Sequence, residues 1–499
     1  MSFTEDRIEQ IIGRFGRYQV WILFLVTLGR YPAEFQLVNV VFIVPSVEFV
    51  CKDADAFNVT NHCPCQQPEY DQSTIVSSVT TEWNLICNRS HLASLAQSIL
   101  QIGILAGSLA FGHISDRYGR KIAVVLALFL EAVFVTLSAF VTDYWMFMVS
   151  RFLIGTALGG TMLCCFVLLV ELSGRTMRPY IMGLCEVPYV SGYVALPIIA
   201  YFVREWRPLQ LVTGAPWLLT LAFYWMLPES PRWLITVGRK KQAIELLTYI
   251  AKKNNRPTDN IETIVNEVEK ESMSTNENKH GSYIDLFKTP KIRKYTIISA
   301  LVWMCCSHTF FGINQYVGHL QGNLYVNVIV TAASNAPGVI IVVIATLHFK
   351  RRATLIGSFA IAGASFVVFV LVPSHLQWVT LMFAIIGQMG VYTAFMQIYM
   401  YSSEMFPTVV RNSALGFSSV FARLGGFIAP YVVNIGIEWA SILIFSAAAF
   451  GAAILCCFFP ETKGVVLSNA IDQVEDKDKR SSEKMYLSSP SPVSIIDHS

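Results

Sequence analysis

Twelve long apolar segments follow one another along this chain and restrict the folds open to it more than any single residue does. With 54% hydrophobic and only 14% charged residues, the chain is far more apolar than soluble domains, in which about 25% of residues are charged. This pattern predicts an all-α polytopic membrane protein with twelve transmembrane helices. The expected spans are residues 18–44, 92–112, 121–141, 144–170, 180–202, 209–227, 294–314, 323–348, 353–372, 377–401, 411–433 and 437–459.

Three short charged motifs occur twice in the chain, and nearly the same number of residues separates the two copies of each motif. The corresponding pairs are Arg120 and Arg352, Glu171 and Glu404, and Glu229 and Glu461. Because each copy also has the same number of apolar segments, we interpret the chain as two parallel six-helix halves. In such a pair one half can rock against the other, as carriers do.

Positive residues fall in alternate loops, which indicates the side of the membrane that each loop faces. They place the cytoplasm at the loops that hold Arg117, Arg120, Lys121, Arg175, Arg178, Arg232, Arg239, Lys240, Lys241, Lys350, Arg351, Arg352 and Arg411. Both termini are then cytoplasmic. The expected divisions are a cytoplasmic N-terminus at 1–17, a first half at 18–227 with a large outer loop at 45–91, a cytoplasmic linker with short helices at 228–293, a second half at 294–459 and a tail of disordered composition at 460–499.

The outer loop has the composition of a secreted segment. Four cysteines lie in it, and an even number in an oxidising compartment predicts two disulfides, with three pairings open: Cys51, Cys63, Cys65 and Cys87. Asn58 and Asn88 begin glycosylation sequons. A metal site is the less favoured interpretation, because His62 is the one obvious nitrogen ligand nearby.

The stretch from Gly112 to Lys121 resembles the signature between the second and third helices of the major facilitator superfamily. Within it, the chain resembles the organic cation, organic anion and carnitine transporter family over about residues 11–465. The matching stretches are 15–19, 69–71, 81–87, 207–210, 322–325 and 399–411. The resemblance implies a solute carrier that moves small organic ions across the plasma membrane within the lipid bilayer.

A sugar porter, and a receptor or channel, are the alternative functions. Sugar porters share the motifs at 228–232 and 460–463 but lack so long a cysteine-bearing first loop, and a receptor or channel without turnover stays open as a further alternative. No phosphate-binding loop, zinc-protease or nucleophile-elbow motif is present, so neither an enzyme nor a resident cofactor is expected. No nucleic-acid partner is indicated, and a coupling ion, H+ or Na+, stays unidentified.

Charged residues at the inner ends of the helices are candidates for a gate. The signature turn supplies Asp116, Arg117, Gly119 and Arg120, and the repeated motifs supply Glu171, Arg175, Glu229, Arg232, Glu404 and Arg411. We expect an ion-pair network that forms in the outward-facing state and breaks in the inward-facing state. A solvated turn that obeys the charge rule is the alternative. Arg151, which opens a run of glycines four residues apart, resembles a superfamily residue associated with coupling.

Charges inside the membrane require a reason because each costs a few kcal/mol. In the resembling family the anion and carnitine branches have Arg at the position of Arg423, which implies a carboxylate on the substrate; a structural arginine is the alternative. Glu34 is a candidate for a substrate amine or a coupling proton, although Arg30 one turn earlier could neutralise it locally. Glu131 and Glu186 are further candidates for pair partners or proton sites.

Aromatic residues at helical spacing complete the candidate substrate site. Aromatic faces attract ammonium groups, although such stripes also serve as packing or lipid-facing surface. The candidates are Tyr392, Phe395 and Tyr399 in the tenth span and Phe310 and Phe311 in the seventh, with Asn314 and Gln388 as hydrogen-bonding partners.

Overall fold

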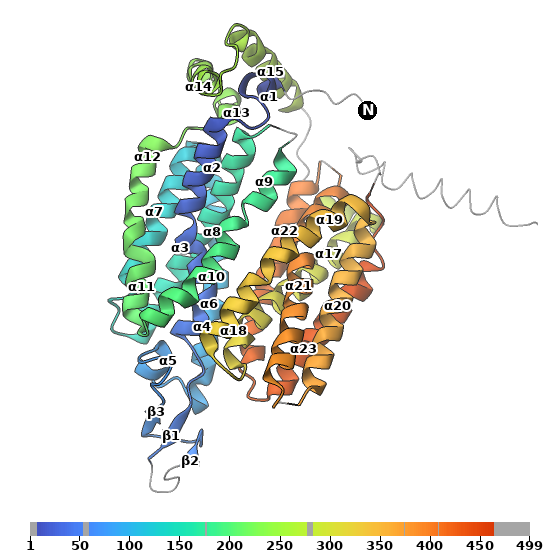
Figure 1. The fold of residues 1–499 in the computed structure, drawn as a ribbon. Coiled ribbons are helices and arrows are strands. Elements are labelled where there is room, and N and C mark those ends of the chain that lie inside the picture. The colour runs from blue at the N-terminus through green and yellow to red at the C-terminus, as the bar shows by residue number, and fades with distance from the viewer. Residues whose placement is uncertain are drawn as a thin grey trace, which may run out of the picture.

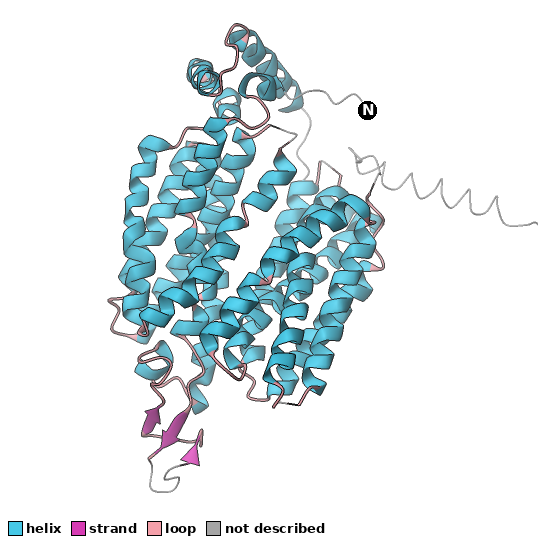
Figure 2. Cartoon of the chain, in the orientation of Figure 1, coloured by secondary structure: helices cyan, strands magenta, loops and turns pink. Residues whose placement is uncertain are grey.

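Two groups of helices make up the molecule (Figure 1). The computed structural model describes residues 7–52, 59–174, 177–276, 283–373, 375–407 and 409–463. The elements from α2 to α12 form the first group, here called the N-terminal half, and those from α17 to α23 form the C-terminal half. Helices dominate, and the few strands gather at one end (Figure 2).

Within the described residues, nine spans are long and apolar enough to cross a membrane. Six of these spans lie in a single α-helix, two combine an α-helix with a 3-10 turn at one end, and the ninth runs through α18 and α19 in succession. Their helices are α6 (Ser90–Tyr118), α7 (Arg120–Ser138), α8 (Tyr144–Leu172), α17 (Pro290–Tyr316), α18 (Leu324–Ala333), α19 (Asn335–His348), α20 (Arg351–Leu371), α21 (Gln377–Met405), α22 (Arg411–Val433) and α23 (Glu438–Cys456).

The three other predicted spans are segmented. Proline is the second residue of the segment that follows a break in each, at Pro32, Pro188 and Pro216. Proline lacks an N–H and its ring clashes with the preceding turn, so it interrupts the helical hydrogen bonds. The segments are α2 (Arg17–Gly29), α3 (Tyr31–Val38) and α4 (Val40–Ile43); α9 (Arg178–Leu184) and α10 (Val187–Phe202); and α11 (Trp206–Gly214), η3 (Ala215–Ala222) and α12 (Phe223–Met226).

Small elements cover both ends of the bundle (Figure 1). One end, here called the linker end, has α1 (Arg7–Ile12), α13 (Pro231–Thr236), α14 (Lys240–Lys253) and α15 (Ile261–Asn276); α16 (Asp285–Lys288) leads into α17. The opposite sheet end has β1 (Phe49–Cys51), β2 (Val59–Thr60), β3 (Pro68–Tyr70), α5 (Val79–Glu82) and the 3-10 turn η2 (Cys87–Arg89).

The outer loop folds around an antiparallel sheet of order β2-β1-β3, which the sequence did not lead us to expect. Val50 pairs with Thr60 on one side and with Glu69 on the other. The two disulfides join Cys51 to Cys65 and Cys63 to Cys87, which selects one of the three pairings left open by the sequence.

Buried apolar clusters show where the halves meet. One cluster contains residues of both halves, among them Tyr189, Phe310 and Tyr392. Two further large clusters lie on either side, one confined to residues 8–265 and the other to residues 286–459. Near the sheet end, α6 also bonds to α22, where Ser98 Oγ donates to the Phe427 carbonyl at 2.7 Å. The halves are therefore packed together at the sheet end of the molecule.

Candidate functional site

An aromatic cluster lies where the two halves meet. The ring of Phe310 stacks on Phe395 at 5.0 Å and on Tyr392 at 6.1 Å between centroids. Tyr392 in turn stacks on Tyr189 of the N-terminal half at 6.0 Å. At the other side Phe395 contacts Tyr399, at 5.6 Å. The residues predicted from α17 and α21 are thus brought together, and α10 adds a ring that the sequence did not single out.

A group of hydrogen-bonded polar side chains, Tyr193, Asn314 and Gln388, lies beside these rings. Tyr193 Oη donates to Asn314 Oδ1 at 2.8 Å, and Gln388 Nε2 donates to the same oxygen at 2.9 Å. The Asn314 amide donates to the Phe310 carbonyl at 2.8 Å. These bonds fix the orientation of Asn314 between α10 and α21. A narrow pocket opens next to it, lined by Tyr189, Phe310, Phe311, Asn314, Gln97 and residues of α3, α4 and α17.

Arg423 lies inside α22 with little to satisfy its charge. Its guanidinium donates one long hydrogen bond, 3.5 Å from Nη1 to Gln101 Oε1 of α6. Among the described residues no carboxylate forms an ion pair with it. The phenol of Tyr399 is near enough to interact with it electrostatically, so Arg423 adjoins the aromatic cluster. A guanidinium has five N–H donors, and this one retains unused capacity for an anionic group.

Arg30 and Glu34 form a buried ion pair at the break between α2 and α3. Arg30 Nη2 lies 2.7 Å from Glu34 Oε1, and Arg30 Nη1 donates to the Cys185 carbonyl at 2.7 Å. The local pair that the sequence allowed is present. Glu34 is 0% exposed, and its Oε2 has no hydrogen-bond partner in the described part of the chain.

Two more acids are buried near this pair. Glu131 accepts a 2.7 Å hydrogen bond from Thr161 and is close enough to Glu34 and Arg30 for charge interaction. Glu186 accepts a 3.5 Å hydrogen bond from Tyr392 Oη, which links the acids to the C-terminal half.

Arg151 is enclosed by amide groups rather than by acids. Its guanidinium donates to Gln36 Oε1 at 3.1 Å, Asn39 Oδ1 at 3.5 Å and Gln97 Oε1 at 3.0 Å, and its side chain is 1% exposed. The glycines that follow it in α8 allow the close approach that the sequence predicts: a Cβ at Gly155 would lie 2.4 Å from the Leu100 carbonyl of α6. Arg151 therefore ties α8 to α3, to Asn39 between α3 and α4, and to α6.

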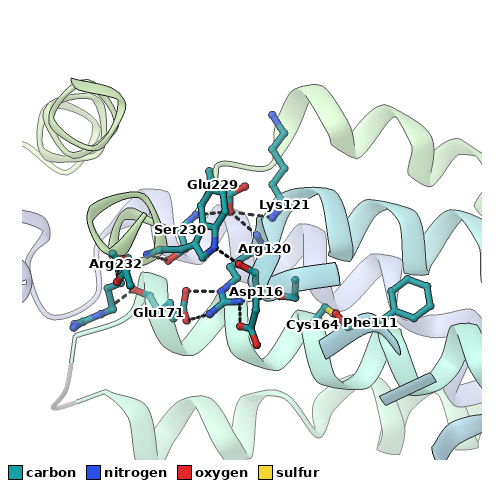
Figure 3. Close-up of polar contacts among 12 residues, drawn as sticks. Phe111, Asp116, Arg120, Lys121, Cys164, Glu171, Glu229, Ser230 and Arg232 are labelled. Atoms are coloured by element: carbon teal, nitrogen blue, oxygen red, sulfur yellow. Dashed lines mark hydrogen bonds and ion pairs between the residues drawn. The ribbon is translucent and has the colours of Figure 1, made fainter. Parts of the chain in front are cut away.

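A charged network joins α6, α7, α8 and α13 at the linker end (Figure 3). Arg120 pairs with Asp116 at 2.5 Å and with Glu171 at 3.1 Å. Glu229 Oε1 accepts hydrogen bonds from the backbone N–H groups of Arg120 at 2.8 Å and Lys121 at 3.1 Å. Burial raises the pKa of the Glu229 carboxyl, although these hydrogen bonds act in the opposite direction.

Two other gate candidates lie beside this network. Arg232 Nε donates to the Glu171 carbonyl at 3.3 Å. Arg117 is exposed and lies over the ring of Tyr118 at 5.8 Å. Arg175 lies outside the described residues. Within the described residues, the ion pairs of Arg120 with Asp116 and Glu171 join elements of the N-terminal half.

Gly119 is required by the geometry of this turn. Its φ of +114° is a conformation that L side chains rarely adopt, and a Cβ there would lie 2.3 Å from Glu229 Oε2. The glycine therefore both closes the turn between α6 and α7 and leaves room for the carboxylate.

The C-terminal half repeats this arrangement, but the residue equivalent to Arg120 lies one position earlier than the sequence analysis assigned it. Arg351 Nε lies 2.8 Å from Glu404 Oε2, and the backbone N–H groups of Arg351 and Arg352 donate to Glu461 at 3.0 and 3.3 Å. Arg351, rather than Arg352, thus occupies the place of Arg120. The motif Lys-Arg-Arg has two arginines in a row, and sequence offers no means of choosing between them. Arg411 donates to the Phe406 carbonyl at 3.4 Å.

Several contacts escaped sequence analysis. Trp303 meets Tyr399 edge-on at 4.3 Å and donates to Ser402 at 3.0 Å, and Tyr193 and Gln101 bond across the halves. Their helical periodicity would have placed them only on a buried face. In the outer loop Asn88 is exposed, while Asn58 lies outside the described residues, and glycosylation at both stays a prediction. Among the described residues no group of His, Cys, Asp and Glu could hold a metal ion.

Comparison with known proteins supplies the family. The family model of the "Sugar (and other) transporter" group matches residues 53–472. The organic cation transporter protein of Drosophila melanogaster is 30% identical over 95% of this chain and 95% of its own length, and organic cation/carnitine transporter 2 of Rattus norvegicus is 33% identical over 94% and 93%. Solute carrier family 22 member 1 of Bos taurus is 34% identical over 85% and 76%.

Solved structures agree on the fold. An inward-open xylose transporter from E. coli superposes with a TM-score of 0.68 at 17% identity, covering 92% of this chain and 99% of that one. The sugar-porter alternative is less well supported than the organic-ion one, because the curated relatives at about 30% identity are named for organic cations and carnitine. The chain is therefore a transporter and not an enzyme, and it belongs to the organic cation, organic anion and carnitine transporter family of the major facilitator superfamily.

Proposed function

We propose that this chain carries small organic ions that bear a carboxylate, either carnitine-like zwitterions or organic anions, across the plasma membrane by alternating access. The observation that carries the proposal is the state of Arg423. Its half-buried guanidinium has one neutral amide partner at 3.5 Å and adjoins an aromatic cluster between the halves. Because a cation within a membrane span is costly without a counter-ion, a substrate carboxylate would stabilise it.

In this proposal, the positively charged end of a zwitterionic substrate lies against aromatic rings and Glu34. The rings of Phe310, Tyr392, Phe395 and Tyr399 offer π faces to an ammonium group. Phe311, Asn314 and Gln388 line or adjoin the neighbouring pocket. Glu34 stands nearby with one carboxylate oxygen free of hydrogen bonds in the described structure and would add attraction for a positive end group.

Alternating access is supported by the distribution of contacts between the halves. The shared apolar cluster and the bond from Ser98 to Phe427 join the halves at the sheet end. The gate candidates of each half pair within that half at the linker end. We infer that this conformation is open toward the linker side. The pairs within each half, Arg120–Glu171 and Arg351–Glu404, are formed in it, so the contacts expected to break in this state would be those between the halves. The residues that we propose control closure of the linker side are Asp116, Arg117, Gly119, Arg120, Arg151, Glu171, Arg175, Glu229, Arg232, Glu404 and Arg411.

The membrane orientation is part of the same proposal. Basic residues concentrate at the linker end, which we assign to the cytoplasm together with both termini. The divisions at 1–17, 18–227, 228–293, 294–459 and 460–499 are retained as functional units. Glu131 and Glu186 are candidates for binding a coupling proton, and Na+ is the alternative coupling ion.

Uptake measurements test the proposal. Labelled carnitine, tetraethylammonium and p-aminohippurate are offered to cells that express the chain, its Arg423→Ala variant or Arg89→Ala, an exposed arginine at the sheet end that serves as control. We expect uptake of carnitine or of the anion to fall at least tenfold in Arg423→Ala at equal surface abundance, and to persist in the control. Cation uptake that is indifferent to Arg423 would overturn the proposal.

Two further experiments distinguish a carrier from a channel or receptor, and H+ coupling from Na+ coupling. Preloading the cells with unlabelled substrate should accelerate uptake by a carrier, whereas a channel or receptor would show no such acceleration. Imposing a pH gradient or replacing Na+ with choline at fixed membrane potential distinguishes the two coupling ions.

A further inference from the structure

A groove at the linker end is not explained by transport of an organic ion. It lies between the start of α2, the end of α12 and one face of α14, and its volume is about 630 Å³. Six of its lining residues are aromatic or basic: Arg17, Tyr18, Trp21, Trp225, Tyr249 and Lys253. It is separate from the aromatic cluster between the halves, since none of its lining residues belongs to the C-terminal half.

The walls of the groove are held in place by Asn254, the residue that follows α14. Its Oδ1 accepts a 3.0 Å hydrogen bond from the backbone N–H of Tyr18, and its Nδ2 donates to the Ile12 carbonyl at 2.9 Å and to Gln19 Oε1 at 2.7 Å. Gly16 permits this approach, because a Cβ there would lie 2.2 Å from the Asn254 side chain. The groove is therefore a built feature and not a chance gap beside a mobile helix.

The aromatic residues of the groove remain open to their surroundings. Trp225 is 76% exposed and Trp21 45%, while Tyr18 meets Tyr249 edge-on at 5.6 Å. Tryptophan and tyrosine collect at the boundary between lipid and water, where their rings are buried among acyl chains and their polar atoms reach the headgroups. Because α2 and α12 are the ends of membrane-spanning segments, these rings mark the headgroup level.

The charge of the groove is positive. Arg17 and Lys253 are both exposed, and neither forms an ion pair with a carboxylate of the described residues. The ammonium of Lys253 lies 5.6 Å from the centre of the Tyr249 ring. Outside the groove, Lys121 lies over the ring of Tyr224 in the same helix as Trp225, at 4.6 Å. An apolar slot with cations at its rim at this depth complements an anionic headgroup attached to acyl chains.

We propose that this groove binds an anionic phospholipid of the cytoplasmic leaflet, with its phosphate between Arg17 and Lys253 and its acyl chains along Trp21 and Trp225. The assignment to that leaflet rests on the membrane orientation proposed above. A bound lipid bridges the first span, the end of the sixth span and the linker helix α14, and so fixes the linker to the N-terminal half.

Native mass spectrometry and thermal unfolding of the full-length purified protein test this binding. Phosphatidylserine, phosphatidylinositol 4,5-bisphosphate, phosphatidylcholine and inorganic phosphate are added separately. Since each basic residue near an anionic lipid contributes about 1 kcal/mol, Arg17→Ala or Lys253→Ala should weaken adduct formation with an anionic lipid about fivefold, and the double variant about thirtyfold. Both anionic lipids should also raise the apparent melting temperature of the wild type.

Matched controls are available in the same segments. Arg14 and Lys252 are exposed basic residues outside the groove, so Arg14→Ala/Lys252→Ala removes the same charge without touching it. Equal loss in the control pair, equal binding of phosphatidylcholine, or equal stabilisation by inorganic phosphate would overturn the proposal. Melting in phosphatidylcholine shows whether each variant is folded. Binding is measured without substrate, so its outcome does not depend on which ion the protein carries.

Discussion

The phenol of Tyr193 donates a 2.8 Å hydrogen bond to the amide oxygen of Asn314, and this bond joins α10 of one half to α17 of the other. Gln388 of α21 shares the same acceptor. The hydrogen bonds of Asn314 therefore depend on the relative position of the two halves. Gln388 belongs to the same half as Asn314, whereas Tyr193 belongs to the other half and must move away when the halves rock.

Replacing Tyr193 with Phe should shift the balance between conformations. The substitution keeps the ring but removes a hydrogen bond, which is worth about 1 kcal/mol, or about a fivefold change in the equilibrium. We expect the population of the linker-open conformation to fall. Spin labels at the exposed positions Tyr118 and Lys350, one in each half, report it as a distance distribution. Tyr201→Phe, in the same helix, is the control, and an unchanged distribution in Tyr193→Phe would contradict the prediction.

Replacing Gly119 with Ala should damage the linker-end network. The positive φ and the 2.3 Å approach of Glu229 both oppose a Cβ, and a strained position of this kind costs on the order of 1–3 kcal/mol. We expect a lower melting temperature and less protein at the cell surface. Gly357→Ala is the matched control, because nothing lies within 4 Å of a Cβ at that helical position. Equal stability of the two variants would show that the turn is not constrained.

Features that depend on short stretches of sequence were predicted well. The pair Arg30–Glu34, one of two alternatives that the sequence left open, agrees with a spacing of one helical turn. The contacts of Arg120 with Asp116 and Glu171 agree with the signature and its repeat. The nine long apolar spans found in the described residues are also local features, since the length of the apolar run alone identifies them.

Features that depend on three-dimensional register were not predictable in the same way. Segmentation at Pro188 depends on whether neighbouring helices compensate for the lost hydrogen bond. The bond from Tyr193 to Asn314 requires knowledge of which faces of α10 and α17 meet. The choice of Arg351 over Arg352 depends on the start of α20, because that helix presents only one of the two side chains to Glu404.

Glu229 should make stability depend on pH. Burial raises its pKa in the folded protein above the unfolded value of about 4.3. The folded state therefore binds the proton more tightly, so this contribution to stability is fully present below the unfolded pKa and is lost as pH rises through the folded one. Melting of the wild type and of Glu229→Gln from pH 4 to pH 8 should show the wild type losing stability relative to the variant. A constant difference, or one of opposite slope, would refute the assignment.

The disulfide pairing can be read from single substitutions. Cys51→Ser should leave one free thiol, at Cys65, and Cys63→Ser one at Cys87. Labelling of intact cells with an impermeant maleimide, followed by peptide mapping, identifies the thiol. Because the bonds close loops with sequence separations of 14 and 24 residues, each loss should cost about 3 kcal/mol. Label on Cys63 or Cys87 after Cys51→Ser would mean that a different pairing exists.

Arg151→Lys should destabilise the N-terminal half although it preserves the charge. The planar guanidinium reaches Gln36, Asn39 and Gln97 at once, whereas a single ammonium cannot match this fork. An amide oxygen left buried without a donor costs about 1–3 kcal/mol, so the loss should approach that of a large core substitution. Arg204→Lys is the control, since Arg204 is exposed and bonds to the Tyr201 and Ser73 carbonyls. The prediction is contradicted if Arg151→Lys has the melting temperature of the wild type while that of Arg151→Leu is lower. The positive charge alone would then matter at this site, and the hydrogen bonds to the three amide side chains would not.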